Sequence, residues 1–275
     1  DGTFLSYFNN KHELIGCDPT IKKFSKYYRK DIKQVPDFFS GKIFQNKYFD
    51  LVTSISMFYD LPDPLNFAKE IFSILKEDGI WHIELSYMPM MLKNLSYDTV
   101  CHEHLEYYSL KSLKFLLDKA NLKIINLSFN QINGGSIALD IAKKNSKFKE
   151  IKYLINWILE SERINKYNEI SRQILFFKQS IKHKYLLKKL LMDLKKNNKK
   201  VFAYGASTKG NVILQYCKIN DKIIKYIGEV NKFKFNKFTP GTKIKIISEK
   251  KLKKMKPDYL LVLPWHFKDH IVKKE

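Results

Sequence analysis

The chain has 275 residues and is 44% hydrophobic, which is enough apolar sequence to bury one or two ordinary cores. Its formal net charge is +22, but only three of its 50 basic residues are arginine, the side chain that base-reading and phosphate-clamping sites use most. The excess of Lys, Asn, Ile, Phe and Tyr indicates a compositional bias of the genome as much as a binding surface. We therefore expect no nucleic-acid partner and only a modest attraction for anionic small substrates.

The three cysteines, Cys17, Cys101 and Cys217, are far apart and form no Cys-x-x-Cys pair or disulfide framework, which favours a reducing cytoplasm. No stretch is long enough to span a membrane and no secretory signal is present, so we expect no membrane partner. The chain opens on Asp1-Gly2-Thr3 and runs straight into helical spacing. We expect it to be a fragment of a longer protein.

In chain order, residues 4–8 have the spacing of a short helix, and residues 12–17 form an apolar run that Asp18 and Pro19 close. An acidic residue at the end of a strand is how a Rossmann-like site holds a ribose diol. Asp18 is equally suited to capping a helix that begins at Pro19. Both interpretations stay open.

The next segments alternate between strands and helices. Residues 41–44 predict a short strand and residues 47–55 a longer one, after which Asp63 and Pro64 open a helix that closes at residues 76–79. A strand is expected at residues 80–85, a helix at 109–119, and strands at 123–128 and 136–142 joined through Asn133-Gly134-Gly135. This alternation predicts a doubly wound α/β domain.

Residues 147–198 contain no Gly or Pro and repeat apolar side chains at helical spacing, which predicts one or two long helices bridging two domains. A second α/β unit follows, with a strand at 199–204, a loop at 205–211 and a helix at 212–217. Further strands are expected at 222–228 and 258–263, the last closed by residues 264–267.

The loop at residues 205–211 lies between a strand and a helix. Its small residues would let main-chain N–H groups approach a phosphate at the helix N-terminus, and Lys209 would add a charge. It is not a Walker loop, because the glycine spacing is wrong. An ordinary strand-to-helix turn explains it as well.

The segment at residues 97–108 holds two of the chain's seven histidines, three carboxylates, a thiol and three phenols. It follows the strand at 80–85, and ligands bind at the carboxyl ends of strands in parallel α/β sheets. His102 and His104 would project on one face of a strand, which suits zinc, but no third ligand follows at a recognisable spacing. We favour acid–base catalysis, for which histidine has a suitable pKa, over a metal site or a purely structural histidine.

Several short motifs occur in a fixed order along the chain. They are Asp50-Leu51-Val52, residues 75–80, Tyr97-Asp98-Thr99 with His102-Glu103-His104, Gly134-Gly135-Ser136, residues 205–211, Pro240-Gly241-Thr242 and residues 263–268. The chain resembles the S-adenosylmethionine-dependent sugar C-methyltransferases, which act on nucleotide-linked 4-keto-deoxyhexoses. The resemblance covers essentially the whole chain, and the His-Glu-His and Gly-Ala-Ser-Thr-Lys-Gly-Asn blocks together are highly specific.

The resemblance implies a Rossmann-like class I methyltransferase domain over residues 1–146, with its first strand and glycine loop missing. A helical linker over 147–198 and a smaller C-terminal Rossmann-like domain over 199–275 would follow. It implies S-adenosylmethionine as the cofactor, a nucleotide-linked keto-deoxysugar as the substrate and no metal in the site.

The resemblance also assigns roles. His104 would be the base that removes a proton next to the ketone, Glu103 would orient and polarise, and His102 and Tyr97 would support the sugar. Asp18 would hold the cofactor ribose. The other implied binding residues are Gly2 and Ser56 for the cofactor and Gly205, Ser207, Lys209 and Asn211 for the substrate.

The chain also departs from the family pattern. It contains no four-cysteine zinc domain, and the first Rossmann strand with its acidic-Gly-Ser-Asn loop has no counterpart. Cys101 stands where the sugar C-3 methyltransferases have Tyr, which leaves the sugar and the methylated carbon open. Two alternatives remain: an NAD-linked oxidoreductase, against which the lack of Gly-x-Gly-x-x-Gly counts, and a truncated remnant that only binds nucleotide-sugar.

Overall fold

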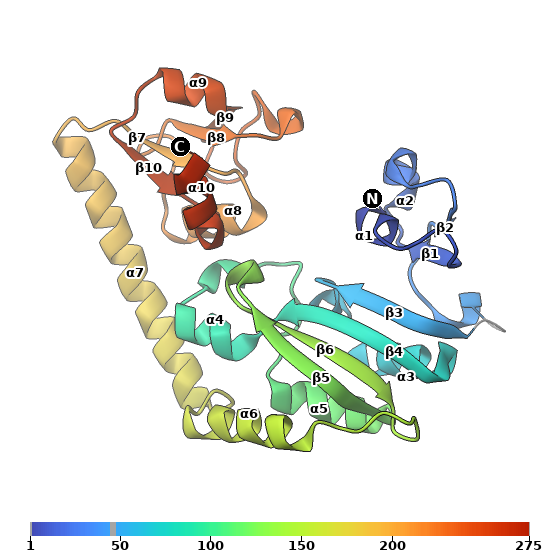
Figure 1. Cartoon of the computed structure of the whole chain (residues 1–275). Helices are drawn as coiled ribbons and strands as arrows, with labels where there is room; N and C mark the ends of the chain where they lie inside the picture. Colours follow the sequence, from blue (N-terminus) through green and yellow to red (C-terminus); the bar gives the residue numbers. More distant parts are fainter. Residues whose placement is uncertain (1, 45–47, 275) are drawn as a thin grey trace.

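The computed structural model describes residues 2–44 and 48–274, so Asp1 and Lys47, which belong to predicted segments, lie outside the described residues. The chain forms a small N-terminal unit, a mixed sheet with helices, two bridging helices and a second sheet with helices (Figure 1). Two α/β units linked by helices are therefore confirmed. None of the helices in the described ranges combines the length and apolarity needed to cross a bilayer.

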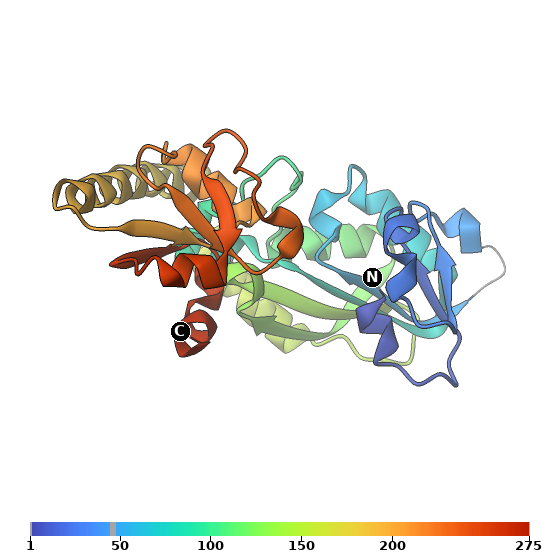
Figure 2. The ribbon, with the colours of Figure 1, turned by 90° about the horizontal axis from the view of Figure 1, so that it is seen from above.

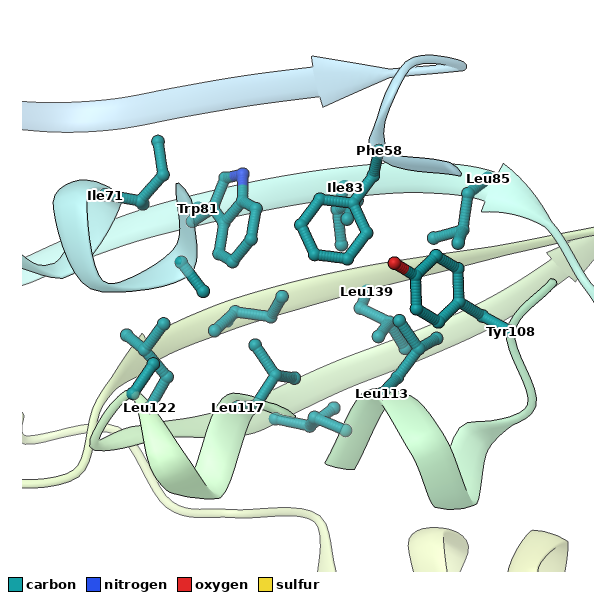
Figure 3. Packing of buried hydrophobic residues seen from close by; sticks show 14 of the residues in the cluster. Phe58, Ile71, Trp81, Ile83, Leu85, Tyr108, Leu113, Leu117, Leu122 and Leu139 are labelled. Atoms are coloured by element: carbon teal, nitrogen blue, oxygen red, sulfur yellow. The ribbon is translucent and has the colours of Figure 1, made fainter. Parts of the chain in front are cut away.

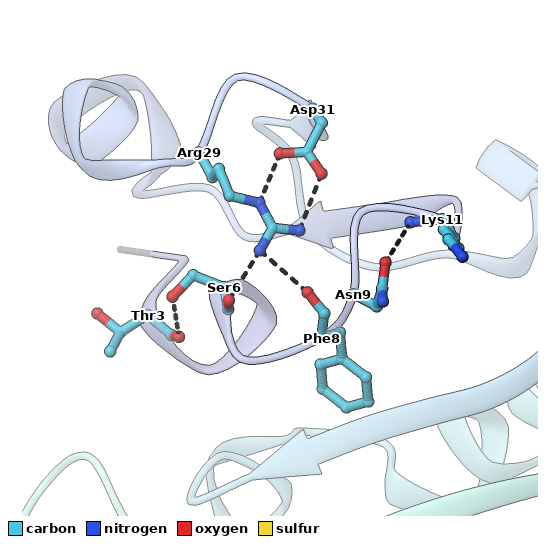
Figure 4. Close-up of polar contacts among 7 residues, drawn as sticks. All are labelled: Thr3, Ser6, Phe8, Asn9, Lys11, Arg29 and Asp31. Atoms are coloured by element: carbon cyan, nitrogen blue, oxygen red, sulfur yellow. Dashed lines mark hydrogen bonds and ion pairs between the residues drawn. The ribbon is translucent and has the colours of Figure 1, made fainter.

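The N-terminal unit contains α1 (Thr3–Ser6), β1 (Leu14–Cys17), α2 (Ile21–Phe24) and β2 (Ile32–Val35). β1 and β2 pair in parallel as a two-stranded sheet of their own. Arg29 joins the parts of this unit, because its guanidinium donates to the carbonyls of Ser6 and Phe8 and to both carboxylate oxygens of Asp31 (Figure 4). Apolar residues of both strands pack against the core of the first large sheet.

The first large sheet has the strand order β3-β4-β6-β5, with β3 parallel to β4 and β6 antiparallel to its neighbours. Its strands are β3 (Phe49–Ile55), β4 (Leu75–Ser86), β5 (Leu122–Asn130) and β6 (Ser136–Lys143). The helices α3 (Pro64–Ile74) and α5 (Leu110–Lys119) supply apolar side chains to a core that includes Trp81, Phe58 and Tyr108 (Figure 3). Burial of this apolar surface is the main stabilising term of the unit.

Both helix starts follow the sequence signals. The Asp63 carboxylate accepts a hydrogen bond from the Asn66 N–H, and Ser109 and Ser112 exchange the reciprocal bonds of a capping box. These contacts satisfy N–H groups that have no partner within the first helical turn.

Three local predictions in this unit are wrong. Residues 41–44 form a 3₁₀ helix instead of a strand. Residues 76–79 belong to β4, because the chain leaves α3 at Ile74 and pairs at once with β3 across a register shift. A helix that the sequence did not predict, α4 (Met88–Asn94), separates β4 from the polar segment. The strands of this part of the chain form two separate sheets, since no described strand joins β1 to β3.

Two helices, α6 (Lys152–Ile164) and α7 (Ile170–Lys196), connect the two lobes, as the sequence predicted. Figure 1 shows α7 running from the first sheet to the second. Its inward side adds Phe176, Leu187, Leu191 and Leu194 to the core of the second lobe.

The second sheet is parallel throughout, with the strand order β10-β7-β8-β9. Its strands are β7 (Val201–Tyr204), β8 (Tyr226–Glu229), β9 (Lys245–Ser248) and β10 (Tyr259–Val262), and its helices are α8 (Thr208–Tyr216), α9 (Glu249–Lys254) and α10 (Lys268–Lys274). The strand order reverses between β7 and β10. In open α/β sheets such a switch point forms a crevice at the carboxyl ends of the strands.

Some elements of this lobe have bounds that differ from the predicted ones. α8 starts at Thr208 instead of Val212 because the Ser207 side chain accepts a hydrogen bond from the Gly210 N–H and caps the helix. β8 covers only the end of the predicted 222–228 strand, and β9 and α9 were not predicted.

Candidate functional site

Loops from both lobes meet at the switch point of the second sheet. From the second lobe come the N-terminal turn of α8 and the 3₁₀ helix Trp265–Phe267 after β10. From the first lobe come the 3₁₀ helices Tyr97–Thr99 and Ile132–Gly134, which pack against α8 and Trp265–Phe267 respectively. Figure 2 shows the two lobes side by side, seen from above.

Lys209 on α8 reaches across this contact. Its Nζ donates to the main-chain oxygen of Asn133 at 3.1 Å and to the Asn133 Oδ1 at 3.2 Å. Burial lowers the pKa of Lys209, while the nearby Asp98 and Cys101 act in the opposite direction. The sequence-predicted Lys209 therefore lies between the lobes, close to the polar segment of the first.

A second contact between the lobes involves Trp265. Its Nε1–H donates to the Asp98 Oδ2 at 2.9 Å, and burial raises the pKa of Asp98 despite this bond. Gly134 has φ +89 and lies so close to the indole that a Cβ there would stand 2.9 Å from Trp265 Cζ2. Only glycine suits a position with both restrictions.

His104 is half-buried beside these groups. One ring nitrogen hydrogen-bonds the main chain of Thr99. Burial lowers the pKa of His104 and the positive charge of Lys209 lowers it further, while Glu103 and the hydrogen bond to Thr99 partly offset both. A neutral imidazole whose N–H is bound to a carbonyl keeps a lone pair on its other nitrogen, which is the state a general base requires.

His102 and Glu103 are exposed and lie in a turn over residues 101–103. The segment is therefore not the strand on which the zinc alternative depended, where alternate rings would share one face. Among residues 2–44 and 48–274, no three His, Cys, Asp or Glu side chains are placed to hold a metal ion.

The structure separates Tyr97 from the other predicted catalytic residues. Its side chain is 8% exposed and belongs to the core of the second lobe. The hydroxyl lies 2.9 Å from His183 Nδ1 on α7 and 3.4 Å from Cys217 Sγ. The sugar-supporting role of Tyr97 stays a prediction. Its hydroxyl is in hydrogen-bonding contact with His183 and Cys217, where the two lobes meet.

The loop at residues 205–211 does not present a row of free N–H groups. The Ala206 N–H donates to the buried Glu229 carboxylate, and the Ser207 N–H donates to the carbonyl of Gly205. Gly205 has φ +86 and packs against Pro264, and Asn211 Oδ1 is buried without a partner among the described residues. These contacts favour the strand-to-helix turn over the phosphate cradle. Lys209 is the residue of this loop that contacts Asn133 of the first lobe.

The predicted cofactor residues fit S-adenosylmethionine unequally. Asp18 is exposed at the carboxyl end of β1, where its Oδ1 accepts from the Thr20 N–H at 2.6 Å, and α2 begins only at Ile21. Its carboxylate has the chemistry to accept hydrogen bonds from a ribose diol. Ser56 stands directly after β3 with φ 55. Gly2 fits less well, because the Tyr28 ring covers it and the Tyr28 hydroxyl bonds its main chain.

Sequence reasoning assigned no site role to several residues of this cluster, among them Tyr59, Asp98, His183 and Trp265, although Asp98 and Trp265 lie in motifs that it singled out. Tyr59 follows the end of β3, so the rule that places ligands at the carboxyl ends of strands was a usable signal. His183, in contrast, lies in a helix interpreted as core, and nothing in its sequence context marked it.

Two family descriptions match the chain. Residues 131–275 match the C-methyltransferase C-terminal domain, and residues 1–127 match a methyltransferase domain. The chain therefore belongs to the C-methyltransferase family, and S-adenosylmethionine is its implied cofactor. The border between the two matches, residues 128–130, falls within the last residues of β5.

The chain is 26% identical over 267 residues to the C-methyltransferase NovU of Streptomyces niveus. The match covers 95% of this chain and 63% of NovU, so the chain spans less than two thirds of that relative's length.

Solved structures that resemble part of the chain include LepI in complex with SAM, at 14% identity and a TM-score of 0.39 over 48% of this chain and 36% of LepI. A putative methyltransferase from Bacillus halodurans matches at 12% identity and a TM-score of 0.40, over 49% of this chain and 84% of that protein.

Proposed function

We propose that the protein transfers a methyl group from S-adenosylmethionine to a carbon next to the ketone of a nucleotide-linked keto-deoxysugar. The observation that carries this proposal is His104, a half-buried imidazole bonded to the main chain of Thr99, whose pKa is lowered by burial and by the positive charge of Lys209. Family membership favours methyl transfer over the NAD-linked alternative.

The reaction needs a base because a carbon is a poor nucleophile until it is deprotonated. The free nitrogen of His104 takes the proton next to the ketone, and the electron pair moves toward the ketone oxygen to give an enolate. When bound, S-adenosylmethionine would supply an electrophilic methyl group to the enolate carbon, with S-adenosylhomocysteine as the leaving product. The product is the methylated ketone.

Lys209 has two supporting roles in this scheme. Its positive charge keeps the pKa of His104 low, so the imidazole stays neutral. A cation held at a site that water reaches poorly also stabilises the negative charge that develops on the enolate oxygen. Gly205, Ser207 and Asn211 shape the turn that presents Lys209, and Asp18 and Ser56 stay proposed for the cofactor.

The test follows proton removal without methyl transfer. In D₂O and with S-adenosylhomocysteine in place of the methyl donor, the wild type exchanges the proton beside the ketone of a nucleotide-linked 4-keto-deoxyhexose. General-base catalysis contributes roughly 10²–10⁴-fold, so His104→Asn should slow this exchange by that order while the sugar still binds.

Two further variants complete the experiment. His102→Asn should slow the exchange less than His104→Asn, since His102 is exposed. Tyr97→Phe should leave the exchange rate nearly unchanged if the Tyr97 hydroxyl only joins the lobes. Exchange by His104→Asn at the wild-type rate would assign the base to another group. Absence of exchange in the wild type, with sugar and S-adenosylhomocysteine both bound, would favour a protein that only binds nucleotide-sugar.

A further inference from the structure

Tyr59 lies between the end of β3 and the segment that carries His104. It belongs to the 3₁₀ helix Phe58–Asp60, and its side chain is 6% exposed. Its main-chain oxygen accepts hydrogen bonds from both Leu105 N–H, at 2.9 Å, and Glu106 N–H, at 3.1 Å. The main chain of Tyr59 therefore fixes the two residues that directly follow His104.

The side chain of Tyr59 contacts His104 itself. The two ring centroids are 4.3 Å apart and the ring planes are inclined by 47°. The Tyr59 hydroxyl hydrogen-bonds the side chain of Ser56, and the Ser56 N–H donates to the Glu84 oxygen of β4 at 2.8 Å. The phenol ring is thus held through its hydroxyl, which Ser56 links to β4, while the Tyr59 main chain is bound to the segment that follows His104.

The other groups around His104 do not define the plane of its ring. The charged groups that act on it are Lys209, from α8, and Glu103, from its own turn, while Asp60 lies next to Tyr59 and near Glu103. Thr99 supplies one hydrogen bond at one ring nitrogen. A single bond leaves the ring free to tilt, and a buried aromatic surface against its face removes that freedom.

We propose that Tyr59 is the positioning residue of His104: its ring fixes the imidazole so that the nitrogen not bound to Thr99 faces the substrate carbon. The catalytic significance of this role rests on the proposed function. Because the Tyr59 hydroxyl is bound to Ser56, a predicted cofactor residue, Tyr59 also connects the base to the edge where the methyl donor is expected.

The experiment has two readouts. The first is nitrogen NMR of His104 in the protein without ligands, with the signal assigned by its loss in His104→Asn. The wild type should show one tautomer and a pKa below the ordinary value. In Tyr59→Leu the His104 ring becomes more hydrated and more mobile. We therefore expect averaged tautomers and a His104 pKa closer to the ordinary value. Tyr59→Phe keeps the ring and loses only the hydroxyl bond to Ser56, so its His104 signals should lie much closer to the wild type than those of Tyr59→Leu.

The second readout is the deuterium exchange described above. Misplacing a catalytic group by about 1 Å costs up to roughly 10²-fold, so Tyr59→Leu should slow exchange at saturating sugar by about tenfold or more, with little change in the KM. Tyr107→Leu is the matched control, because Tyr107 is a half-buried phenol near Cys101. Tyr59→Met fills the space without an aromatic ring and replaces Tyr59→Leu if that variant does not fold.

The outcomes separate the two proposals. If the His104 signals of Tyr59→Leu and Tyr59→Met equal those of the wild type, Tyr59 does not position the ring. Equal slowing by Tyr107→Leu and Tyr59→Leu would also overturn the proposal, since general loosening would explain it. If the wild type shows no exchange, the proposed function fails, yet the NMR arm still decides the role of Tyr59.

Discussion

The pKa of His104 depends first on burial and then on its charged neighbours Lys209 and Glu103. Burial disfavours the charged imidazolium and lowers the pKa, and Lys209 lowers it further by repulsion. A base with a lowered pKa stays neutral, and therefore able to accept a proton, down to a lower pH. If His104 is the base, as proposed, Lys209 thus extends its active range toward acid.

Replacing Lys209 by methionine should raise the pKa of His104, because a repulsive positive charge is removed while the apolar volume is kept. Together with the His104 pKa, the acid limb of the pH profile for deuterium exchange should move to higher pH. The measurement is an NMR titration of His104 in the ligand-free protein. Lys188→Met, an exposed position on α7, is the control. A His104 titration unchanged by Lys209→Met would contradict the electrostatic coupling.

At the scale of elements, one buried carboxylate joins α6 to the start of α5 and to Tyr87, which lies between β4 and α4. Glu162 on α6 is 2% exposed and accepts hydrogen bonds from the N–H groups of Leu110 and Lys111 at the start of α5. It also accepts from the Tyr87 hydroxyl and from the Asn168 amide. A negative charge at a helix N-terminus is favourable, and these donors have no other partner within the helix.

The variant Glu162→Gln should lower the free energy of unfolding by roughly 2–3 kcal/mol, because charge-assisted bonds are lost and the new amide N–H₂ faces donors. Urea unfolding followed by circular dichroism measures this. Glu160→Gln is the matched control on the same helix, since Glu160 pairs with Arg163 at the surface and should change little. Equal effects of the two substitutions would mean that Glu162 is not the buried anchor described here.

At the scale of the whole molecule, the site exists only where the two lobes touch. The contacts that hold it are Lys209 to Asn133, Trp265 to Asp98, and Gly134 against the Trp265 indole. Lobes joined by a long helix and a few such contacts are expected to move unless the contact is close. The close approach at Gly134 is therefore a sensitive point for the arrangement of the site.

The variant Gly134→Ala should open this contact. Both the positive φ and the 2.9 Å approach to Trp265 oppose a Cβ, and a strained residue of this kind costs roughly 1–3 kcal/mol. The expected result is faster hydrogen exchange at the Trp265 indole N–H and slower substrate deuteration. Gly241→Ala has a similar φ of +72 but meets only the flexible Gln215 side chain, so it should leave the Trp265 indole protected. If the Trp265 indole N–H exchanges as slowly in Gly134→Ala as in the wild type, the contact between the lobes has not opened.

Much of the secondary structure followed from local signals in the sequence. The caps at Asp63 and Ser109 marked α3 and α5, and the absence of Gly and Pro over residues 147–198 marked the bridging helices. The errors occurred where tertiary pairing overrode local preference. Residues 76–79 look like a helix stop, but the neighbouring β3 offers hydrogen bonds that extend β4 to Leu75.

For the site, the sequence by itself determined that His104 and Lys209 belong to two motifs of one family. Only the tertiary structure decided that the two motifs come together, that Tyr97 turns toward His183, and that Tyr59 packs on His104. The physical reason is that spacing along a chain encodes hydrogen bonds and periodic faces, which are local. The burial and charge that set the pKa of His104 come from residues far away in sequence, and these reach it only when both lobes have folded.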